Sequence, residues 1–212
     1  MRRGQSSWSD VPFITFNMER FTRKNINTPE LSEKIFKEKW NEDVHTVDGN
    51  RFDELARDFK GGRYLDIGCF NSPKLGELAE IEGNEIHGID HAKRVIDVMS
   101  LKFPNVNYKV GDCYELPYED EYFDYIVSGE LLEHLEVPQE MIAEAMRVLK
   151  SGGTMAISTP YMEGRGQSLI SDEHLWSFGY ADMSELFDQY GRVEITVNSD
   201  NVKVFLVYVT KN

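Results

Sequence analysis

The chain has 212 residues, which is enough for one domain with a substantial core and too few for two ordinary domains. Its composition, 41% hydrophobic and 28% charged, is that of a globular protein and excludes wholesale disorder. The formal net charge of −14 opposes binding to phosphate backbones and anionic lipid, so we expect neither nucleic acid nor a membrane as partner. The sequence shows no apolar run near the ~20 residues of a membrane span, no secretory signal and only two cysteines, so we expect a cytoplasmic protein.

Two helices are predicted before the first strand. The segment 28–40 begins with a threonine cap and a proline in the first helical position, and the segment 50–62 repeats apolar residues at helical spacing before two glycines. Residues 1–27 have no clean period but contain one tryptophan and three phenylalanines. We therefore predict a helical and aromatic cap segment, residues 1–49, followed by a main domain, residues 50–212.

Strands and helices alternate from residue 63 onward. The predicted strands are 63–68, 85–90, 106–112, 123–130 and 154–160, and the predicted helices among them are 73–83, 92–103 and 138–153. Such alternation with short connections indicates a parallel sheet covered by helices on both faces. The last segment, 192–212, has the pattern of two strands joined by a short polar turn, which is an antiparallel hairpin. The predicted fold class is therefore α/β, a doubly wound and mostly parallel sheet that a C-terminal antiparallel hairpin extends to seven strands.

Three acidic residues lie at or near the carboxyl ends of successive predicted strands, where open α/β sheets bind ligands. Asp66 lies two residues before Gly68, Asp90 ends the second strand, and Asp112 ends the third. Asp90 follows Gly68 by 22 residues, about the spacing at which an acidic residue reaches the hydroxyl pair of a ribose. A single aspartate after a strand is more often a turn or helix cap, but three along one sheet edge indicate a ligand site.

Several motifs resemble those of the class I S-adenosylmethionine-dependent methyltransferases, in particular the small-molecule branch that includes quinone-biosynthesis enzymes. They are LDIGCFNSP, IHGIDHA, VGDCYELPYEDEYFDYIVSGELLEHL and MRVLKSGGTMAISTP, in chain order. The resemblance covers about residues 50–212 and implies a Rossmann-like methyltransferase fold, with the last strand inserted antiparallel into the sheet. It also implies methyl transfer from S-adenosylmethionine to a small-molecule acceptor, with S-adenosylhomocysteine as the product.

The same resemblance implies which residues bind the cofactor. Asp66 and the loop from Gly68 would hold its methionine part, Asp90 its ribose, and Asp112 with Cys113 its adenine. The full set of implied cofactor-binding residues is Asp66, Gly68, Cys69, Phe70, Asn71, Asp90, His91, Asp112, Cys113 and Ser128.

The first motif departs from the usual pattern of an acidic residue followed by three alternate glycines. Gly68 is present, but Phe70 and Ser72 stand where the second and third glycines would be. Asn71 tolerates a positive φ, so we expect the turn to be preserved in a shifted form, with the benzyl group of Phe70 pointing away from the cofactor or covering it. A nicotinamide cofactor fits less well, because its turn needs Gly-x-Gly-x-x-Gly and the chain keeps the first position alone.

Methyl transfer is an in-line displacement that needs positioning and, for a hydroxyl or acidic C–H acceptor, a base. His134 and His174 are the predicted base candidates, because an unperturbed imidazole titrates at about pH 6.5. Glu130 and Glu133 are alternatives, and Glu133 is equally open to being a partner that orients a helix. A structural role is equally open for His134, and a role at a helix entry or lid for His174. The remaining histidines have no ligand spacing with cysteines or carboxylates, so we predict no metal site.

Two other functions remain open at the level of the sequence. One is a protein that binds S-adenosylmethionine or S-adenosylhomocysteine without catalysis, which Phe70 in the glycine position favours. The other is a methyltransferase of protein side chains, for which the net charge of −14 would suit a basic peptide. The sequence leaves both a monomer and a homodimer open.

Overall fold

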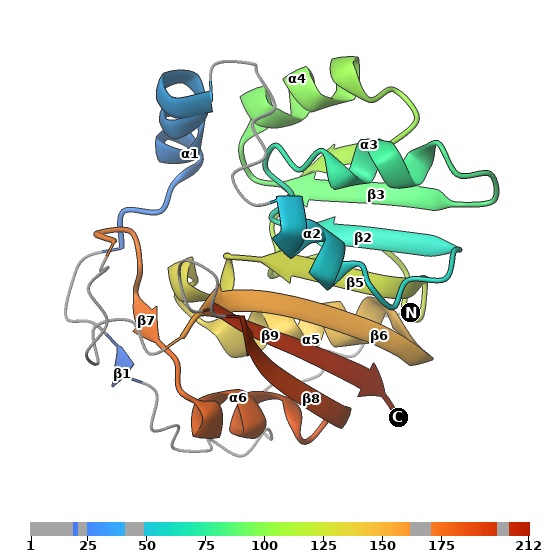
Figure 1. Ribbon diagram of the computed structural model, residues 1–212. Helices are drawn as coiled ribbons and strands as arrows, with labels where there is room; N and C mark the ends of the chain where they lie inside the picture. Colours follow the sequence, from blue (N-terminus) through green and yellow to red (C-terminus); the bar gives the residue numbers. More distant parts are fainter. Residues whose placement is uncertain (1–18, 21–24, 41–48, 162–170, 199–203) are drawn as a thin grey trace, which may run out of the picture.

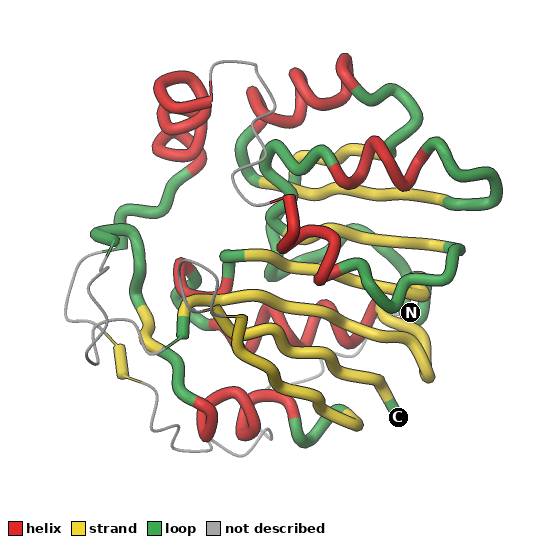
Figure 2. The backbone as a smooth tube through the Cα atoms, in the orientation of Figure 1, coloured by secondary structure: helices red, strands yellow, loops and turns green. Residues whose placement is uncertain are grey.

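The computed structural model describes residues 19–20, 25–40, 49–161, 171–198 and 204–212. These residues form a seven-stranded sheet with helices on both faces, and a separate pair of very short strands (Figures 1 and 2). The strands of the large sheet are β2 (Arg63–Ile67), β3 (Glu85–Asp90), β4 (Asn107–Val110), β5 (Phe123–Gly129), β6 (Leu149–Pro160), β8 (Gly191–Asn198) and β9 (Val204–Lys211). The helices and helical turns are α1 (Pro29–Ile35), η2 (Phe36–Trp40), α2 (Gly49–Leu55), α3 (Lys74–Ala79), α4 (Lys93–Lys102), η3 (Leu132–His134), α5 (Pro138–Val148) and α6 (Tyr180–Phe187). The short pair is β1 (Glu19–Arg20) with β7 (Trp176–Ser177).

The order of the large sheet is β4-β3-β2-β5-β6-β9-β8. The strands from β4 to β6 are parallel, whereas β9 runs antiparallel to both of its neighbours. This confirms the predicted mostly parallel seven-stranded sheet with its antiparallel C-terminal hairpin. The chain proceeds from β2 outward to β3 and β4 and then returns to β5 on the other side of β2, so the strand order reverses between β2 and β5.

The core is divided by the sheet into two layers, because successive side chains of a strand point to opposite faces. Leu65 and Ile67 of β2 pack with α5 and α6, whereas Tyr64 packs with α2, α3 and α4 on the other face. Figure 1 shows α2 and α3 in front of the sheet and α5 behind it. Strands buried on both faces read as continuous apolar runs, which is why they were recognisable in the sequence.

The connection between α5 and β6 differs from the prediction. The helix expected over 138–153 ends at Val148, and the next residue, Leu149, already has the extended conformation and pairs with Phe123 of β5. Gly152, with a φ of +77°, would also be a poor helical residue. The strand expected over 154–160 therefore begins five residues earlier, as β6.

Other predicted helices are shorter, and some elements were not predicted. The helix expected over 28–40 divides into α1 and the π-helical turn η2, the one expected over 50–62 ends at Leu55, and the one expected over 73–83 ends at Ala79. Helix α6 and the β1–β7 pair were missed. In the part of the chain that the structure describes, no helix has both the length and the apolar character needed to cross a bilayer.

Candidate functional site

The loops at the carboxyl edge of the sheet, beside the reversal of strand order, form the candidate site. The loop after β2 is fixed to the end of β3, since the backbone N–H groups of Gly68 and Cys69 both donate to the carbonyl oxygen of Ile89, at 2.9 and 3.1 Å. Gly68 has a φ of +73°, and a Cβ added there would lie 2.9 Å from Leu131 Cδ2. A side chain at position 68 would therefore be strained by the backbone conformation and would press on Leu131 in the loop after β5.

Asp90 holds the two loops that flank the end of β3. Its Oδ2 accepts a hydrogen bond from the N–H of Phe70 at 3.0 Å, and its Oδ1 accepts one from the N–H of Ala92 at 2.8 Å. Burial raises the pKa of Asp90, and these two hydrogen bonds to the charged form oppose that rise. The carboxylate thus lies at the predicted position and fixes the loop that was predicted to bind the cofactor.

Phe70 takes the positive φ, which corrects the prediction that Asn71 would take it. Phe70 has a φ of +37°, and Asn71 is not among the positive-φ residues of the described chain. The Phe70 ring packs edge to face against Phe36 of η2, with 5.7 Å between ring centres, and joins a small cluster on α4 that includes Val95. The ring therefore packs toward η2 and α4.

Asp66 lies beneath this loop, near Asp90 of the neighbouring strand. It is 3% exposed. Burial, followed by the nearby charge of Asp90, raises the pKa of Asp66 to about 7. Among the described residues, the buried side-chain nitrogen of Asn71 has no hydrogen-bond partner. The loop thus encloses a titratable carboxyl group and an amide with an unused donor.

Two predicted cofactor-binding residues have side chains that lie inside the protein. Cys69 is buried in the core layer of α3, where burial raises the pKa of its thiol. Ser128 is fully buried, and its hydroxyl donates to the carbonyl oxygen of Ile67 at 3.1 Å. Their side chains therefore support the ends of β2 and β5, and a role in binding a ligand stays a prediction for both.

The remaining predicted cofactor-binding residues lie at the surface of this edge. Asp112 is exposed, and its Oδ1 accepts a hydrogen bond from the N–H of Tyr114 at 2.9 Å. Cys113 is partly buried, which raises the pKa of its thiol to about 12. His91 is exposed, and its Nε2 lies 2.8 Å from the hydroxyl of Ser32 in α1. His91 thus connects the leading helix to the loop after β3.

Glu130 begins the loop after β5 in an unusual backbone conformation. Its φ is +52°, and its N–H donates to the carbonyl oxygen of Ser158 at 2.9 Å. Its carboxylate forms an ion pair with Arg51 of α2 at 3.2 Å. A positive φ in a residue other than glycine is costly and is concentrated at functional sites. Phe70 and Glu130 both carry one, and both lie in loops at the carboxyl edge.

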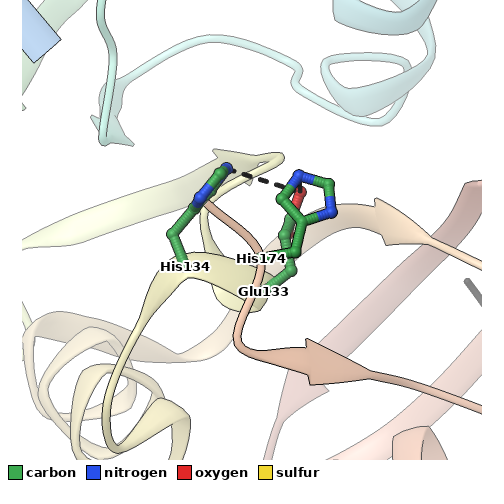
Figure 3. A group of neighbouring side chains, drawn as sticks. All are labelled: Glu133, His134 and His174. Atoms are coloured by element: carbon green, nitrogen blue, oxygen red, sulfur yellow. Dashed lines mark ion pairs between the residues drawn. The ribbon is translucent and has the colours of Figure 1, made fainter. Parts of the chain in front are cut away.

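Glu133, His134 and His174 form a compact cluster beside these loops. Figure 3 shows Glu133 and His134 on the turn after β5 and His174 on the segment before β7, with their side chains directed toward one another. Glu133 Oε1 lies 3.9 Å from His134 Nε2 and 4.0 Å from His174 Nε2. The two imidazole rings meet edge to face, with 4.7 Å between their centres. One potential ligand atom from each residue lies within 4.8 Å of the others.

Hydrogen bonds with neighbouring residues fix the side chains of the cluster. Glu133 is buried, and its Oε2 accepts from the hydroxyl of Thr159 at 2.9 Å. His134 Nδ1 lies 3.1 Å from the carbonyl oxygen of Glu173, to which it donates in the tautomer with the proton on Nδ1. Burial, followed by the nearby His174, lowers the pKa of His134 to about 4, so this ring is neutral at neutral pH.

Asn27, just before α1, connects the two segments that carry the cluster. The side-chain nitrogen of Asn27 donates to the carbonyl oxygens of His134, at 3.0 Å, and of Glu173, at 2.8 Å. The N–H of Leu175 donates to the carbonyl oxygen of Glu133 at 2.7 Å. Sequence reasoning selected both histidines but missed Asn27 and did not group Glu133 with them, because no local spacing relates residues that only the fold brings together.

Comparison with known proteins was made on both sequence and structure. Residues 65–157 match the model of a family described as a methyltransferase domain. A probable S-adenosylmethionine-dependent methyltransferase of Mycolicibacterium smegmatis is 26% identical over 144 residues, which are 66% of this chain and 55% of that protein. Over residues 65–157 the chain thus has the pattern of a methyltransferase domain, and the relative that it resembles is named as S-adenosylmethionine-dependent.

Two further proteins similar to this domain extend the comparison. A ubiquinone biosynthesis O-methyltransferase of Coxiella burnetii is 29% identical over 151 residues, covering 65% of this chain and 64% of that one. The chain thus spans about half to two thirds of the length of these curated relatives. A phosphoethanolamine N-methyltransferase of Haemonchus contortus in complex with S-adenosyl-L-methionine shares the fold, with a TM-score of 0.68 at 15% identity over 85% of this chain and 60% of that one.

Proposed function

We propose that this protein transfers the methyl group of S-adenosylmethionine to a small-molecule acceptor in the cytoplasm. The observation that carries the proposal is the pair of buried carboxyl groups, Asp66 and Asp90, at the ends of neighbouring strands beside the reversal of strand order in a methyltransferase domain. We further propose that residues 1–49 act as a cap on the main domain, residues 50–212. The contact of His91 with Ser32 of α1 supports this division.

The residues present fit the cofactor. The methionine part carries an ammonium group, and Asp66 supplies a buried carboxyl group beside Gly68. Asn71 supplies a buried donor without a partner in the described chain. The Phe70 ring packs against Phe36, so a side chain in place of the missing glycine is compatible with binding. When bound, the cofactor supplies an activated methyl group, and the protein supplies its positioning.

The proposed acceptor site lies next to the turn after β5. Leu131 contacts the turn at Gly68, and Glu130, His134 and His174 lie on or near the same loop. We propose that these three groups border the acceptor. The net charge of −14 supports a small molecule over a nucleic acid. The Coxiella relative, named for an O-methyltransferase of ubiquinone biosynthesis, supports the same class of acceptor.

Calorimetric titration of the purified protein tests this function. We expect S-adenosylmethionine and S-adenosylhomocysteine to bind with micromolar dissociation constants and NAD to give no binding heat. Asp90→Ala should weaken S-adenosylhomocysteine binding by about 5- to 150-fold, equal to about 1–3 kcal/mol, since hydrogen bonds to a buried charged group are lost.

Asp97→Ala is the matched control, because Asp97 is an exposed aspartate on the outer face of α4. Its affinity should equal that of the unaltered protein. Absence of binding by either sulfur compound would overturn the proposed function. Equal affinity of the Asp90→Ala variant would remove Asp90 from the binding site.

A further inference from the structure

We propose that Glu133, His134 and His174 bind a divalent transition-metal ion. Two imidazoles and one carboxylate, each able to give one ligand atom, converge from two segments that are distant in the sequence. This donor set is the one that Zn²⁺ and related ions use in sites that keep further positions open.

The distances between the three ligand atoms are somewhat longer than those around a bound ion. Ligand atoms around an ion at ~2.1 Å are roughly 3.0–3.4 Å apart. Glu133 Oε1 lies 3.9 Å from His134 Nε2 and 4.0 Å from His174 Nε2, so each pair has to close by less than about 1 Å. The ligand atoms of the two histidines lie within 4.8 Å of each other, so that pair has to close by at most about 1.8 Å through rotation of the side chains.

The hydrogen bonds around the cluster have the arrangement that metal ligands need. A ligating histidine generally donates its second ring N–H to a carbonyl or carboxylate, which fixes the ring and directs the other nitrogen to the metal. His134 Nδ1 contacts the carbonyl oxygen of Glu173, which leaves Nε2 toward the cluster. The hydroxyl of Thr159 donates to Oε2 of Glu133, which leaves Oε1 toward both histidines. Asn27 in turn fixes the carbonyl groups of His134 and Glu173.

The cluster is partly exposed on its histidine side. The side chain of Glu133 is 2% exposed, whereas those of His134 and His174 are 25% and 15% exposed. An ion bound there would be covered by protein on the Glu133 side. It would keep coordination positions for water or another molecule on the histidine side. Leu131, two residues before Glu133, contacts the Gly68 turn, so the cluster adjoins the proposed cofactor loop.

This placement, which rests on the proposed function, points to an acceptor that binds through oxygen. An ion lowers the pKa of a hydroxyl that ligates it. The hydroxyl then releases its proton to water, and its oxygen forms a bond with the methyl carbon of the sulfonium. The carbon–sulfur bond breaks with both electrons passing to sulfur, which yields the methyl ether and S-adenosylhomocysteine. The substrate class is accordingly a small molecule with a hydroxyl group able to coordinate a metal.

Metal binding can be measured without knowledge of the acceptor. Protein stripped with a chelator is titrated with Zn²⁺ by calorimetry and with Co²⁺ by visible absorption. We expect one ion per chain and a Co²⁺ spectrum typical of nitrogen and oxygen ligands. Glu133→Gln keeps the shape of the side chain but removes its charge, and it should weaken binding at least about tenfold. His174→Gln, at the more distant segment, should do the same.

Glu140→Gln is the matched control, because Glu140 is an exposed glutamate in the first turn of α5. This variant should bind the ion as the unaltered protein does. Circular dichroism and S-adenosylhomocysteine titration of each variant establish that it is folded. An unaltered protein that binds no stoichiometric ion, or variants Glu133→Gln and His174→Gln that bind it equally well, would overturn the metal site.

A separate measurement tests whether an acceptor can bind the ion through oxygen. Acetohydroxamate, a small oxygen chelator, should shift the visible spectrum of the Co²⁺ protein by occupying open positions, and an unchanged spectrum would overturn an oxygen acceptor at the ion. Failure of the metal titration with normal S-adenosylhomocysteine binding leaves the proposed function standing. Metal binding without S-adenosylhomocysteine binding would leave the metal site standing and overturn the proposed function.

Discussion

Phe70 adopts a backbone conformation that glycine adopts without cost. Its φ of +37° places Cβ close to the backbone, which costs an ordinary residue about 1–2 kcal/mol. Two contacts offset this strain: the hydrogen bond from its N–H to Asp90 and the packing of its ring against Phe36. The phenylalanine in the turn after β2 is thus supported by partners on β3 and η2.

Paired substitutions at Phe70 separate the strain from the packing. Phe70→Ala and Phe70→Gly both remove the ring, but the alanine keeps the unfavourable φ. We expect the free energy of unfolding to be about 1 kcal/mol higher for the glycine variant than for the alanine variant, measured by urea denaturation. At the exposed helical position Asp97 the same pair should give the opposite order, by about 1 kcal/mol. Alanine above glycine at both positions would contradict a strained Phe70.

At the scale of an element, helix α5 organises the loop between β4 and β5. The guanidinium group of Arg147 donates to the carbonyl oxygens of Leu116 and Tyr118, at 3.0 and 2.9 Å. It also donates twice to Glu144, at 2.9 and 2.8 Å, whose carboxylate accepts from the N–H of Leu116 at 3.0 Å. One pair of charged residues on the last turns of α5 therefore holds the loop that follows Asp112 and Cys113.

Arg147→Lys tests this arrangement. A lysine keeps the charge but presents a single point donor, so it cannot satisfy two carbonyl groups and both carboxylate oxygens together. We expect the free energy of unfolding to fall by about 1–3 kcal/mol, measured by chemical denaturation. Arg192→Lys on the exposed side of β8 is the control and should change it by less than about 0.5 kcal/mol. Equal stability of the two variants would show that the loop does not depend on the fork of the guanidinium group.

At the scale of the whole molecule, the sheet brings two acidic residues together that are far apart in the unfolded chain. Asp66 is the last residue but one of β2, Asp90 ends the neighbouring parallel strand β3, and both are buried. Burial and the charge of Asp90 raise the pKa of Asp66 from an ordinary 3.8 to about 7. The folded protein therefore binds a proton at Asp66 between these values, while the unfolded chain has released it.

The sign of the resulting pH dependence follows from linkage. The stability that the neutral Asp66 contributes is present below about pH 4 and is lost as the pH rises through about 7. Relative to Asp66→Asn, the free energy of unfolding of the unaltered protein should fall over this range, by at most about 4 kcal/mol. Urea denaturation at a series of pH values measures the difference. Asp97→Asn, at an exposed site, should run parallel to the unaltered protein, and a parallel profile for Asp66→Asn would contradict the raised pKa.

The fold was predictable because its signals are local. Apolar runs at 63–67, 85–90 and 123–129 mark strands buried on both faces, and glycine or proline marks the connections between helices and strands. The places of Asp66, Gly68 and Asp90 at the carboxyl edge were predictable for the same reason, since strand ends set them. Their role in binding a cofactor stays a prediction. The exit from α5 was misplaced because pairing of Leu149 with β5 overrides a local helical pattern.

The sequence by itself determined the alternating α/β architecture, the antiparallel hairpin and the carboxyl-edge aspartates, because each depends on periodicity or spacing within one segment. Only the tertiary structure decided that Phe70 takes the positive φ, since Asp90 and Phe36 hold it there. It alone brought Glu133 and His134 to His174, through hydrogen bonds that Asn27 makes to both segments. Such a group is formed by backbone contacts between distant parts of the chain, and no period or spacing in the sequence encodes them.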